Sequence, residues 1–202
     1  MKIGEDHIIE GVTLDLIKGG NDMPIRRAVV IHFTSGATAK SSINFWRSKA
    51  AKGASAHVII DRDGTIIQCR PFDKTCGHAG VSRWKDPCSK RVFSGMNSCS
   101  IGIELANAGE DDELTERWSN LPPLVARHRN GGNIEEWEKY TNEQLDACFK
   151  VTRAVVDRYN LDDIVGHEDI APERKNDPGP AFPMELLRKH CGFTGLPKVH
   201  WP

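Results

Sequence analysis

The amino-acid sequence predicts an α/β fold in which helices pack on the faces of a central β-sheet. Three observations support this prediction. Short apolar runs rich in β-branched residues alternate along the chain with segments of helical periodicity, an order of elements typical of an α/β sheet. The 202 residues fit one compact domain, which would bury roughly 70% of the surface that its unfolded chain exposes. No internal repeat or low-complexity tract interrupts the sequence, so we expect a single domain over residues 1–202.

A strand, a helix and a hairpin are expected in the first part of the chain. Residues 27–33 contain the apolar run AVVIHF, which is typical of a buried strand, and the breakers TSG follow it. Residues 38–52 carry apolar side chains at helical spacing and predict a helix. The apolar triplets at 58–60 and 65–67 flank the turn DRDG, whose glycine can adopt positive φ, and therefore predict a hairpin.

The middle of the chain combines one strand with two irregular segments. Residues 71–97 are rich in turn formers and predict loops. Residues 100–105, SIGIEL, predict another apolar strand. Residues 109–140 contain the pairs PP and GG among scattered charges, and we interpret them as a long surface insertion with little regular structure.

The last part of the chain predicts two helices and a short strand. Thr141 is a suitable N-cap, and apolar residues then recur at three- and four-residue spacing as far as Tyr159. Residues 161–165 predict a strand and residues 184–190 a closing helix. The core of the domain is therefore expected over about residues 27–187.

Composition argues against several classes of function. The 27 basic and 28 acidic residues are interspersed and give a formal net charge of −1, which does not favour nucleic acid or an anionic membrane surface as a partner. The N-terminus has no basic region followed by an apolar stretch, and no segment approaches the roughly 18 apolar residues of a membrane span. We therefore expect a monomer that is made as a soluble cytoplasmic chain and does not insert into membranes.

The six cysteines include no C-x-x-C pair, so a four-cysteine structural zinc site is not expected. Because no export signal is recognisable, we interpret the cysteines as mostly reduced thiols. A bridge among Cys69, Cys76, Cys88 and Cys99 stays open, since residues that are distant in sequence can be close in space.

Residues 166–182, GHEDIAPERKNDPGPAF, have the makeup of a metal site. Their three prolines and two glycines argue against a regular helix, so we expect His167, Lys175 and Asp177 to project from a rigid, irregular loop. Imidazole and carboxylate are both ligands of Zn²⁺, and a catalytic zinc usually has three protein ligands and one open position. We predict His32, near the end of the first apolar strand, as the third ligand; the alternative is a core histidine bonded to a backbone carbonyl.

Glu104 lies inside the apolar run SIGIEL, where a carboxylate is costly to bury without a partner or a task. Alternation along a strand also allows Glu104 on the solvent face. Beside a zinc site, its carboxylate can act as a general base that takes a proton from the attacking water and passes it to the leaving amine. Lys175 would then stabilise the oxyanion of the tetrahedral intermediate, although its charged neighbours also fit an ordinary exposed lysine.

The chain resembles the zinc-dependent N-acetylmuramoyl-L-alanine amidases of type 2 in five segments: AVVIHFTSG, SAHVIIDRDGTIIQ, CGHAGVSRW, SIGIELANAG and GHEDIAPERKNDPGPAF. That superfamily includes phage amidase endolysins, cytosolic cell-wall recycling amidases and peptidoglycan recognition proteins. The resemblance covers residues 27–187 and implies a mixed sheet of five or six strands, with helices on both sides and a surface groove across the zinc. It implies zinc ligands and catalytic residues at five positions: His32, His167 and Asp177 as ligands, with Glu104 and Lys175 as catalytic residues.

The resemblance also implies substrate contacts in the groove. It places His57 and His78 along the groove and Arg174 where it can meet a stem-peptide carboxylate in a bidentate bond. His57 equally fits a partner of a metal ligand or a residue packed in the sheet. Trp46 and Trp84 could stack on sugar rings, although aromatic residues are more often part of the core.

Three classes of function compete. An active amidase would cleave the bond between N-acetylmuramic acid and L-alanine in peptidoglycan or its muropeptides. A non-catalytic recognition module would bind muramyl peptide, but such modules typically lack the third zinc ligand that Asp177 supplies here. A metal-stabilised structural or inhibitory protein is the third class, and no extended N-terminal arm argues for it. We therefore predict a zinc hydrolase.

Two roles within the amidase class stay open. A recycling enzyme would act in the cytoplasm, whereas a phage endolysin would pass from the host cytoplasm to the periplasm through a holin. Residues 55–84 and the aspartate ligand look closer to the recycling and Gram-negative-phage branches. The expected absence of a cell-wall-binding module fits a thin murein or a soluble fragment as substrate.

Overall fold

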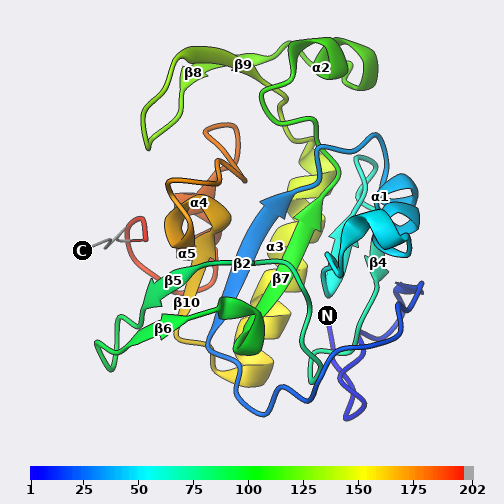
Figure 1. Ribbon diagram of the computed structural model, residues 1–202, viewed down its shortest axis with the longest axis vertical. Helices are drawn as coiled ribbons and strands as arrows, with labels where there is room; N and C mark the ends of the chain where they lie inside the picture. The colour runs from blue at the N-terminus through cyan, green and yellow to red at the C-terminus, as the bar shows by residue number, and fades with distance from the viewer. Residues whose placement is uncertain (198–202) are drawn as a thin grey trace.

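A six-stranded mixed sheet forms the centre of this computed structural model, which describes residues 1–197 (Figure 1). Its strands lie in the order β1 (Thr13–Leu14), β4 (Ile66–Gln68), β3 (Val58–Ile60), β7 (Ser100–Leu105), β2 (Ala28–Phe33) and β10 (Asp163–Gly166). Only the β3–β4 pair of this sheet is antiparallel, and the other neighbours run parallel. The mixed α/β architecture expected from the sequence is therefore confirmed.

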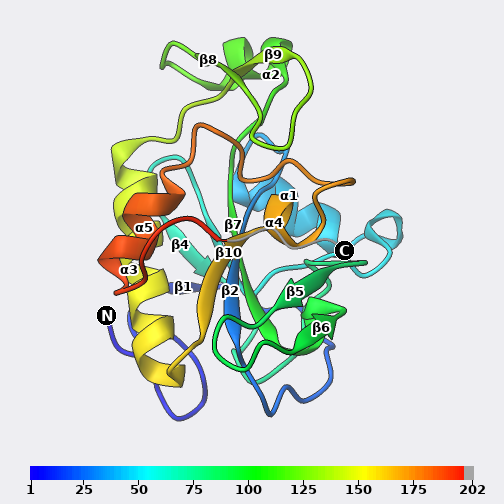
Figure 2. The same ribbon diagram turned by 90° about the vertical axis from the view of Figure 1, so that its left-hand side faces the viewer.

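Helices cover both faces of the sheet. Figure 2 shows the sheet nearly edge-on, with α3 (Asn142–Tyr159) and α5 (Met184–His190) on one side and α1 (Ala39–Trp46) and α4 (His167–Ile170) on the other. Side chains alternate between the two faces of β2, so Val29 and Ile31 join the apolar cluster beneath α3, whereas Ala28 and Val30 join a cluster on the opposite face. The last buried residue of β2, His32, lies on that opposite face.

The strands at 28–33 and 100–105 and the helix at 184–190 agree with the prediction. The long helix is also confirmed, because the Thr141 side chain accepts a hydrogen bond from the Gln144 amide and caps α3. The helix expected over residues 38–52 is shorter than predicted. It ends at Trp46, Ser48 adopts an extended backbone, and a separate 3₁₀ turn, η1 (Lys49–Ala51), follows.

Two segments predicted as irregular contain regular structure. Residues 71–97 include a hairpin of β5 (Arg83–Lys85) and β6 (Val92–Ser94), and a 3₁₀ turn, η2 (Met96–Ser98), begins there. The insertion forms α2 (Asp112–Trp118) and a hairpin of β8 (Leu124–Arg127) and β9 (Ile134–Trp137). The expectation of little regular structure in the insertion was wrong, because its glycine pair, at positive φ, belongs to the connection between two paired strands.

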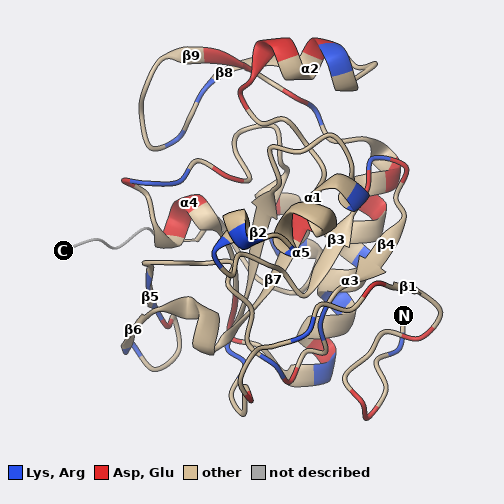
Figure 3. Cartoon of the chain, turned by 45° about the vertical axis from the view of Figure 1, so that its right-hand side comes forward, with Lys and Arg blue, Asp and Glu red and all other residues tan. Residues whose placement is uncertain are grey.

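Charged side chains of both signs are scattered over the elements, and acidic residues gather on α2 and β9 (Figure 3). None of the helices within residues 1–197 combines the length and the apolar character needed to cross a membrane. All six cysteines are free thiols.

Candidate metal centre and surrounding active-site groups

Three parallel strands bring the predicted site residues to one edge of the sheet. His32 of β2 pairs in register with Glu104 of β7. On the other side of β2, Gly166 ends β10 beside Ile31, so His167 follows at the level of His32. Ligand sites of open α/β sheets commonly lie at the carboxyl ends of parallel strands.

His167 begins the one-turn helix α4, so the prediction that it projects from an irregular loop was wrong. The first proline of the segment is Pro172, which lies beyond α4 and leaves residues 167–170 free to form a helical turn. The Asp169 side chain accepts a hydrogen bond from the Gly166 amide and caps the turn. Lys175 and Asp177 lie outside helices and strands, as expected.

The three predicted ligands converge. The Nδ1 atoms of His32 and His167 lie 3.0 Å apart, and Asp177 Oδ2 lies 2.8 Å from the first and 3.0 Å from the second. All three residues are buried. Ligand atoms about 2.0–2.1 Å from a tetrahedral zinc are separated by roughly 3.3 Å, so this triangle has the dimensions of a metal site. Two imidazole nitrogens that face each other at 3.0 Å cannot both carry a proton there, whereas one cation suits both nitrogens and the carboxylate.

Hydrogen bonds on the far side of each ring orient the two histidines. His167 Nε2 donates to the Ala79 carbonyl at 3.1 Å. His32 Nε2 lies 3.0 Å from His78 Nδ1, and His78 Nε2 lies 3.3 Å from the Ser100 carbonyl, so a chain of donors runs from His32 through His78 to the backbone. With the protons on Nε2, the Nδ1 lone pairs of both ligands point at the shared space.

Charge states at this cluster favour cation binding. Burial, followed by the neighbouring His167, lowers the pKa of His32 to about 4, so its imidazole is neutral at pH 7. Burial by itself would raise the pKa of Asp177, but its close contacts with His167 and His32 outweigh burial and hold the pKa below the usual range. A neutral imidazole and a charged carboxylate are the forms that bind metals.

Glu104 and Lys175 share a cavity of about 300 Å³ with the three candidate ligands. Glu104 Oε2 is buried and has no hydrogen-bond partner within residues 1–197. Burial, and then the charge of Asp177, raises the pKa of Glu104 well above its ordinary value, while Lys175 opposes the shift. The cavity therefore combines a carboxylate with an uncommitted oxygen, an ammonium group and a place for a cation.

The three predicted substrate contacts differ in their surroundings. His78 lines the cavity and also bonds to His32. His57 is fully buried, with Nε2 donating to the Lys74 carbonyl at 2.8 Å and Nδ1 accepting from the Gly102 amide at 3.0 Å. Both ring nitrogens of His57 are thus engaged by backbone, and the prediction that it lies along the groove is not met. Its alternative interpretation, a residue packed in the sheet, describes it better.

Arg174 is exposed, and its Nη2 donates to the carbonyls of Ala79 at 3.0 Å and Val81 at 2.9 Å. The Nη2 group of the guanidinium is therefore already bonded to backbone carbonyls, whereas the sequence predicted that Arg174 would bind a stem-peptide carboxylate in a bidentate bond. Trp46 lines the cavity, as a stacking residue would. Trp84 is buried and donates to Asp163 at 3.1 Å, so it belongs to the core.

Two further residues of the cavity were not predicted from the sequence. Glu110, at the start of the insertion, lines it together with Asn176, and the Asn176 side-chain amide donates to the Glu110 carboxylate. The position of Glu110 beside a motif 66 residues away depends on the path of the insertion.

The close approach of His78 to the sheet had a signal in the sequence, namely Gly102, since a glycine within a strand often marks a close approach. A Cβ on Gly102 would lie 2.5 Å from His78 Cγ.

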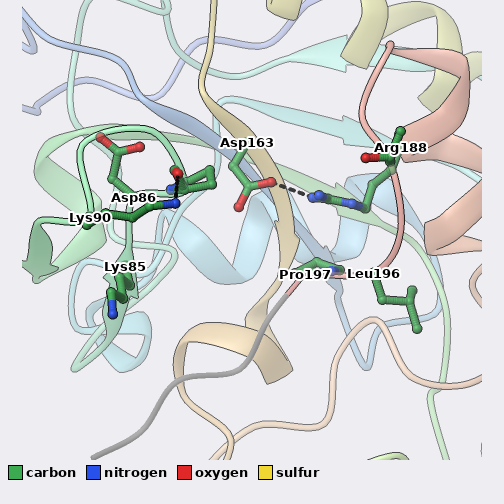
Figure 4. Close-up of a pocket in the computed structure, with 9 residues that line it drawn as sticks. Lys85, Asp86, Lys90, Asp163, Arg188, Leu196 and Pro197 are labelled. Atoms are coloured by element: carbon green, nitrogen blue, oxygen red, sulfur yellow. Dashed lines mark hydrogen bonds and ion pairs between the residues drawn. The ribbon is translucent and has the colours of Figure 1, made fainter.

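A second pocket, of about 360 Å³, lies near β5 and α5 (Figure 4). Asp163 and Arg188 point toward one another there and form an ion pair. Nearby, Asp86, Cys88 and Asp162 also place potential metal-binding atoms within 4.8 Å of one another. The carboxylate of Asp86 accepts from the Cys88 amide and Ser89 hydroxyl, and that of Asp162 from Arg27, so these oxygens already have donors. The His32, His167 and Asp177 cluster is the better metal site.

Known proteins resemble this chain in sequence and in fold. A family model described as N-acetylmuramoyl-L-alanine amidase matches residues 21–180. The 1,6-anhydro-N-acetylmuramyl-L-alanine amidase AmpD of Enterobacter cloacae is 37% identical over 155 residues, which cover 74% of this chain and 63% of that protein. The chain thus spans somewhat less than two thirds of this relative.

Solved structures show the same fold. The E. coli N-acetylmuramyl-L-alanine amidase AmiD, in complex with the substrate anhydro-N-acetylmuramic acid-L-Ala-D-gamma-Glu-L-Lys, is 25% identical with a TM-score of 0.64, and the match covers 91% of this chain and 63% of that one. The solution structure of Citrobacter freundii AmpD is 27% identical with a TM-score of 0.57, and the match covers 94% and 95% of the two chains.

Proposed function

The chain belongs to the N-acetylmuramoyl-L-alanine amidase family, and from this premise we propose that it is a zinc hydrolase that cleaves the amide bond between N-acetylmuramic acid and L-alanine. The observation that carries the proposal is the triangle of His32, His167 and Asp177, with edges of 2.8 to 3.0 Å, in one cavity with Glu104 and Lys175. Two nitrogens and one carboxylate oxygen form a donor set typical of a catalytic zinc.

The residues of the site would have the following roles in the reaction. His32, His167 and Asp177 would hold the zinc, which when bound would supply Lewis acidity for amide hydrolysis. Glu104 takes a proton from the water whose oxygen attacks the carbonyl carbon, using the carboxylate oxygen that has no hydrogen-bond partner among residues 1–197. The same carboxyl group then delivers the proton to the amide nitrogen as the carbon–nitrogen bond breaks, so the products are a carboxylic acid and a free amine.

Lys175 and His78 contribute in different ways, the first through its charge and the second by orienting a ligand. The Lys175 ammonium, in the same cavity as Glu104, stabilises the negative charge that develops on the carbonyl oxygen. His78 Nδ1 accepts a hydrogen bond from His32 Nε2. This bond keeps the Nδ1 lone pair of His32 directed into the cavity. A preorganised site of this kind needs little rearrangement during the reaction.

We infer that soluble muropeptides with a 1,6-anhydro sugar are the substrate class. Support comes from the relatives, since AmpD is named for this substrate and AmiD was solved with an anhydro-N-acetylmuramic acid tripeptide. Mass spectrometry of products from anhydromuropeptide, compared with intact sacculi, tests the proposal. Release of the stem peptide from the soluble substrate is expected. Binding of muropeptide without any product would instead favour a recognition module.

A further inference from the structure

The insertion reaches the segment that carries two of the proposed zinc ligands. Its hairpin lies above the sheet edge, and the connection between β8 and β9 bends toward α4 (Figures 1 and 2). Three consecutive residues of this connection contact α4. His128 Nε2 donates to Glu168 Oε2 at 2.6 Å, Arg129 pairs with Asp169 at 2.9 Å, and the Asn130 side-chain amide donates to the Glu168 carbonyl at 3.0 Å.

Glu168 links this connection to both ligands. It follows His167 directly, and its backbone amide donates to the Asp177 carbonyl at 2.8 Å. Its carboxylate also accepts from the Gly179 amide at 3.2 Å, two residues beyond Asp177. A displacement of Glu168 would therefore move both the helical turn that carries His167 and the chain that carries Asp177.

The orientation of His128 is itself fixed. Its Nδ1 accepts from the Asn130 amide at 3.1 Å, so the proton on Nε2 is available to Glu168. The ring also stacks on Trp137 of β9, with centroids 5.7 Å apart. His128 and Glu168 are both more than nine-tenths buried, and the Glu168 carboxylate also lies 3.6 Å from Arg129 Nη1. Loss of the His128 donor would leave this buried carboxylate with fewer partners, which is unfavourable.

Trp137 makes a second contact with the ligand segment. A Cβ on Gly179 would lie 2.6 Å from the indole ring, so a glycine allows the close approach. Nearby, the Tyr140 hydroxyl donates to the Pro178 carbonyl at 2.8 Å. The end of the insertion thus packs on the residues that follow Asp177, while its hairpin connection holds the residue that follows His167.

We propose that the insertion is a clamp for the metal centre, in which Glu168 is a positioning residue and His128 is its donor. The clamp rests on the proposed zinc site and adds residues to it that do not themselves bind the metal. By fixing Glu168, the insertion holds two ligands that are ten positions apart in the chain at the spacing the metal needs. Loss of such supporting bonds typically costs about 10- to 100-fold in metal affinity.

Zinc affinity of the full chain, measured by competition with a chromophoric chelator, tests the clamp. Glu168→Gln and His128→Leu should each weaken zinc binding about 10- to 100-fold. His128→Gln, which keeps an N–H donor, should bind zinc more tightly than His128→Leu. Glu136→Gln on the exposed side of the same hairpin is the matched control and should bind like wild type. The absorption spectrum of the cobalt(II) form should change in Glu168→Gln and not in the control.

The outcomes separate the clamp from the metal site itself. A wild-type chain that binds no zinc would reject the proposed function. A wild-type chain that binds zinc, together with a folded Glu168→Gln variant whose affinity and cobalt spectrum match it, would overturn the clamp. If Glu168→Gln does not fold, the two His128 variants decide: unequal zinc affinities support the clamp and equal ones overturn it. The double variant Glu168→Gln/His128→Leu should bind zinc no more weakly than the weaker-binding single variant. Additive losses of zinc affinity would contradict an effect of His128 that acts through Glu168.

Discussion

His32 and Glu104 occupy the same register position on the adjacent parallel strands β2 and β7. Paired residues of neighbouring strands point to the same face of a sheet. A candidate ligand and a candidate base that are 72 residues apart in the sequence are thereby neighbours, and their strands are almost entirely buried. The sheet register therefore fixes the relation between metal and base more firmly than a loop would.

Removal of a ligand should remove the metal. His167→Ala and Asp177→Ala should each lose zinc, because two protein ligands remain where a catalytic zinc site uses three. Elemental analysis after dialysis measures the zinc content. Glu104→Gln is the control, since it lies in the same cavity and should keep one zinc per chain. Stoichiometric, tightly held zinc in both ligand variants would refute the ligand assignment.

Glu104→Gln should slow turnover by on the order of a hundredfold or more, because it removes proton transfer and leaves the metal's polarisation of the carbonyl in place. Steady-state kinetics on a soluble muropeptide gives kcat, and zinc content is measured on the same sample. Near-native kcat with full zinc content would mean that the carboxylate is only structural.

Lys175→Ala should lower kcat by roughly ten- to a thousandfold and change KM little, because an oxyanion contact strengthens in the transition state. Lys175→Arg should restore part of the loss, since its planar fork cannot place the charge at the same point. A lysine that only binds a carboxylate of the stem peptide would give a different result. In that case KM would rise while kcat held.

Gly102→Ala tests the support of His32 by His78. The added Cβ would lie 2.5 Å from His78 Cγ, so the ring must move and its bond to His32 should weaken. We expect zinc affinity to fall about tenfold. Ile103→Val, on the opposite face of the same strand, is the control, because it should cost about 0.5–1.5 kcal/mol of stability without affecting zinc. Equal zinc affinity of the two variants would show that His78 does not orient the ligand.

Local sequence patterns predicted the elements that hold the site and missed the contacts that join them. The run AVVIHF and the Thr141 cap each specify their element through neighbouring residues, and both agree with the structure. The bond between His128 and Glu168 joins residues 40 apart, in a segment whose proline and glycine pairs suggested irregular structure. A periodicity argument has no access to such a pair, because it depends on how the insertion folds back.

His57 was placed along the groove on the basis of resemblance, and its burial leads instead to a prediction about stability. Burial lowers its pKa from 6.5 to about 4, so the folded chain keeps this imidazole neutral where the unfolded chain protonates it. The unfolded state therefore binds more protons between pH 6.5 and 4, and the stability present above pH 6.5 is lost as the pH falls through this window. The loss attributable to His57 is about 3 kcal/mol.

Replacement of the imidazole should abolish this loss. We expect the difference in unfolding free energy between wild type and His57→Gln to shrink by about 3 kcal/mol from pH 7 to pH 4, because only wild type carries the titrating group. Urea unfolding at each pH, with a chelator present throughout so that metal release does not contribute, measures the difference. His57→Asn also lacks the imidazole and should show the same change. A difference that is independent of pH for both variants would mean that the pKa of His57 is the same in the folded and the unfolded chain. The bonds of His57 to the Lys74 carbonyl and the Gly102 amide argue against this, since the amide needs an unprotonated Nδ1 as its acceptor.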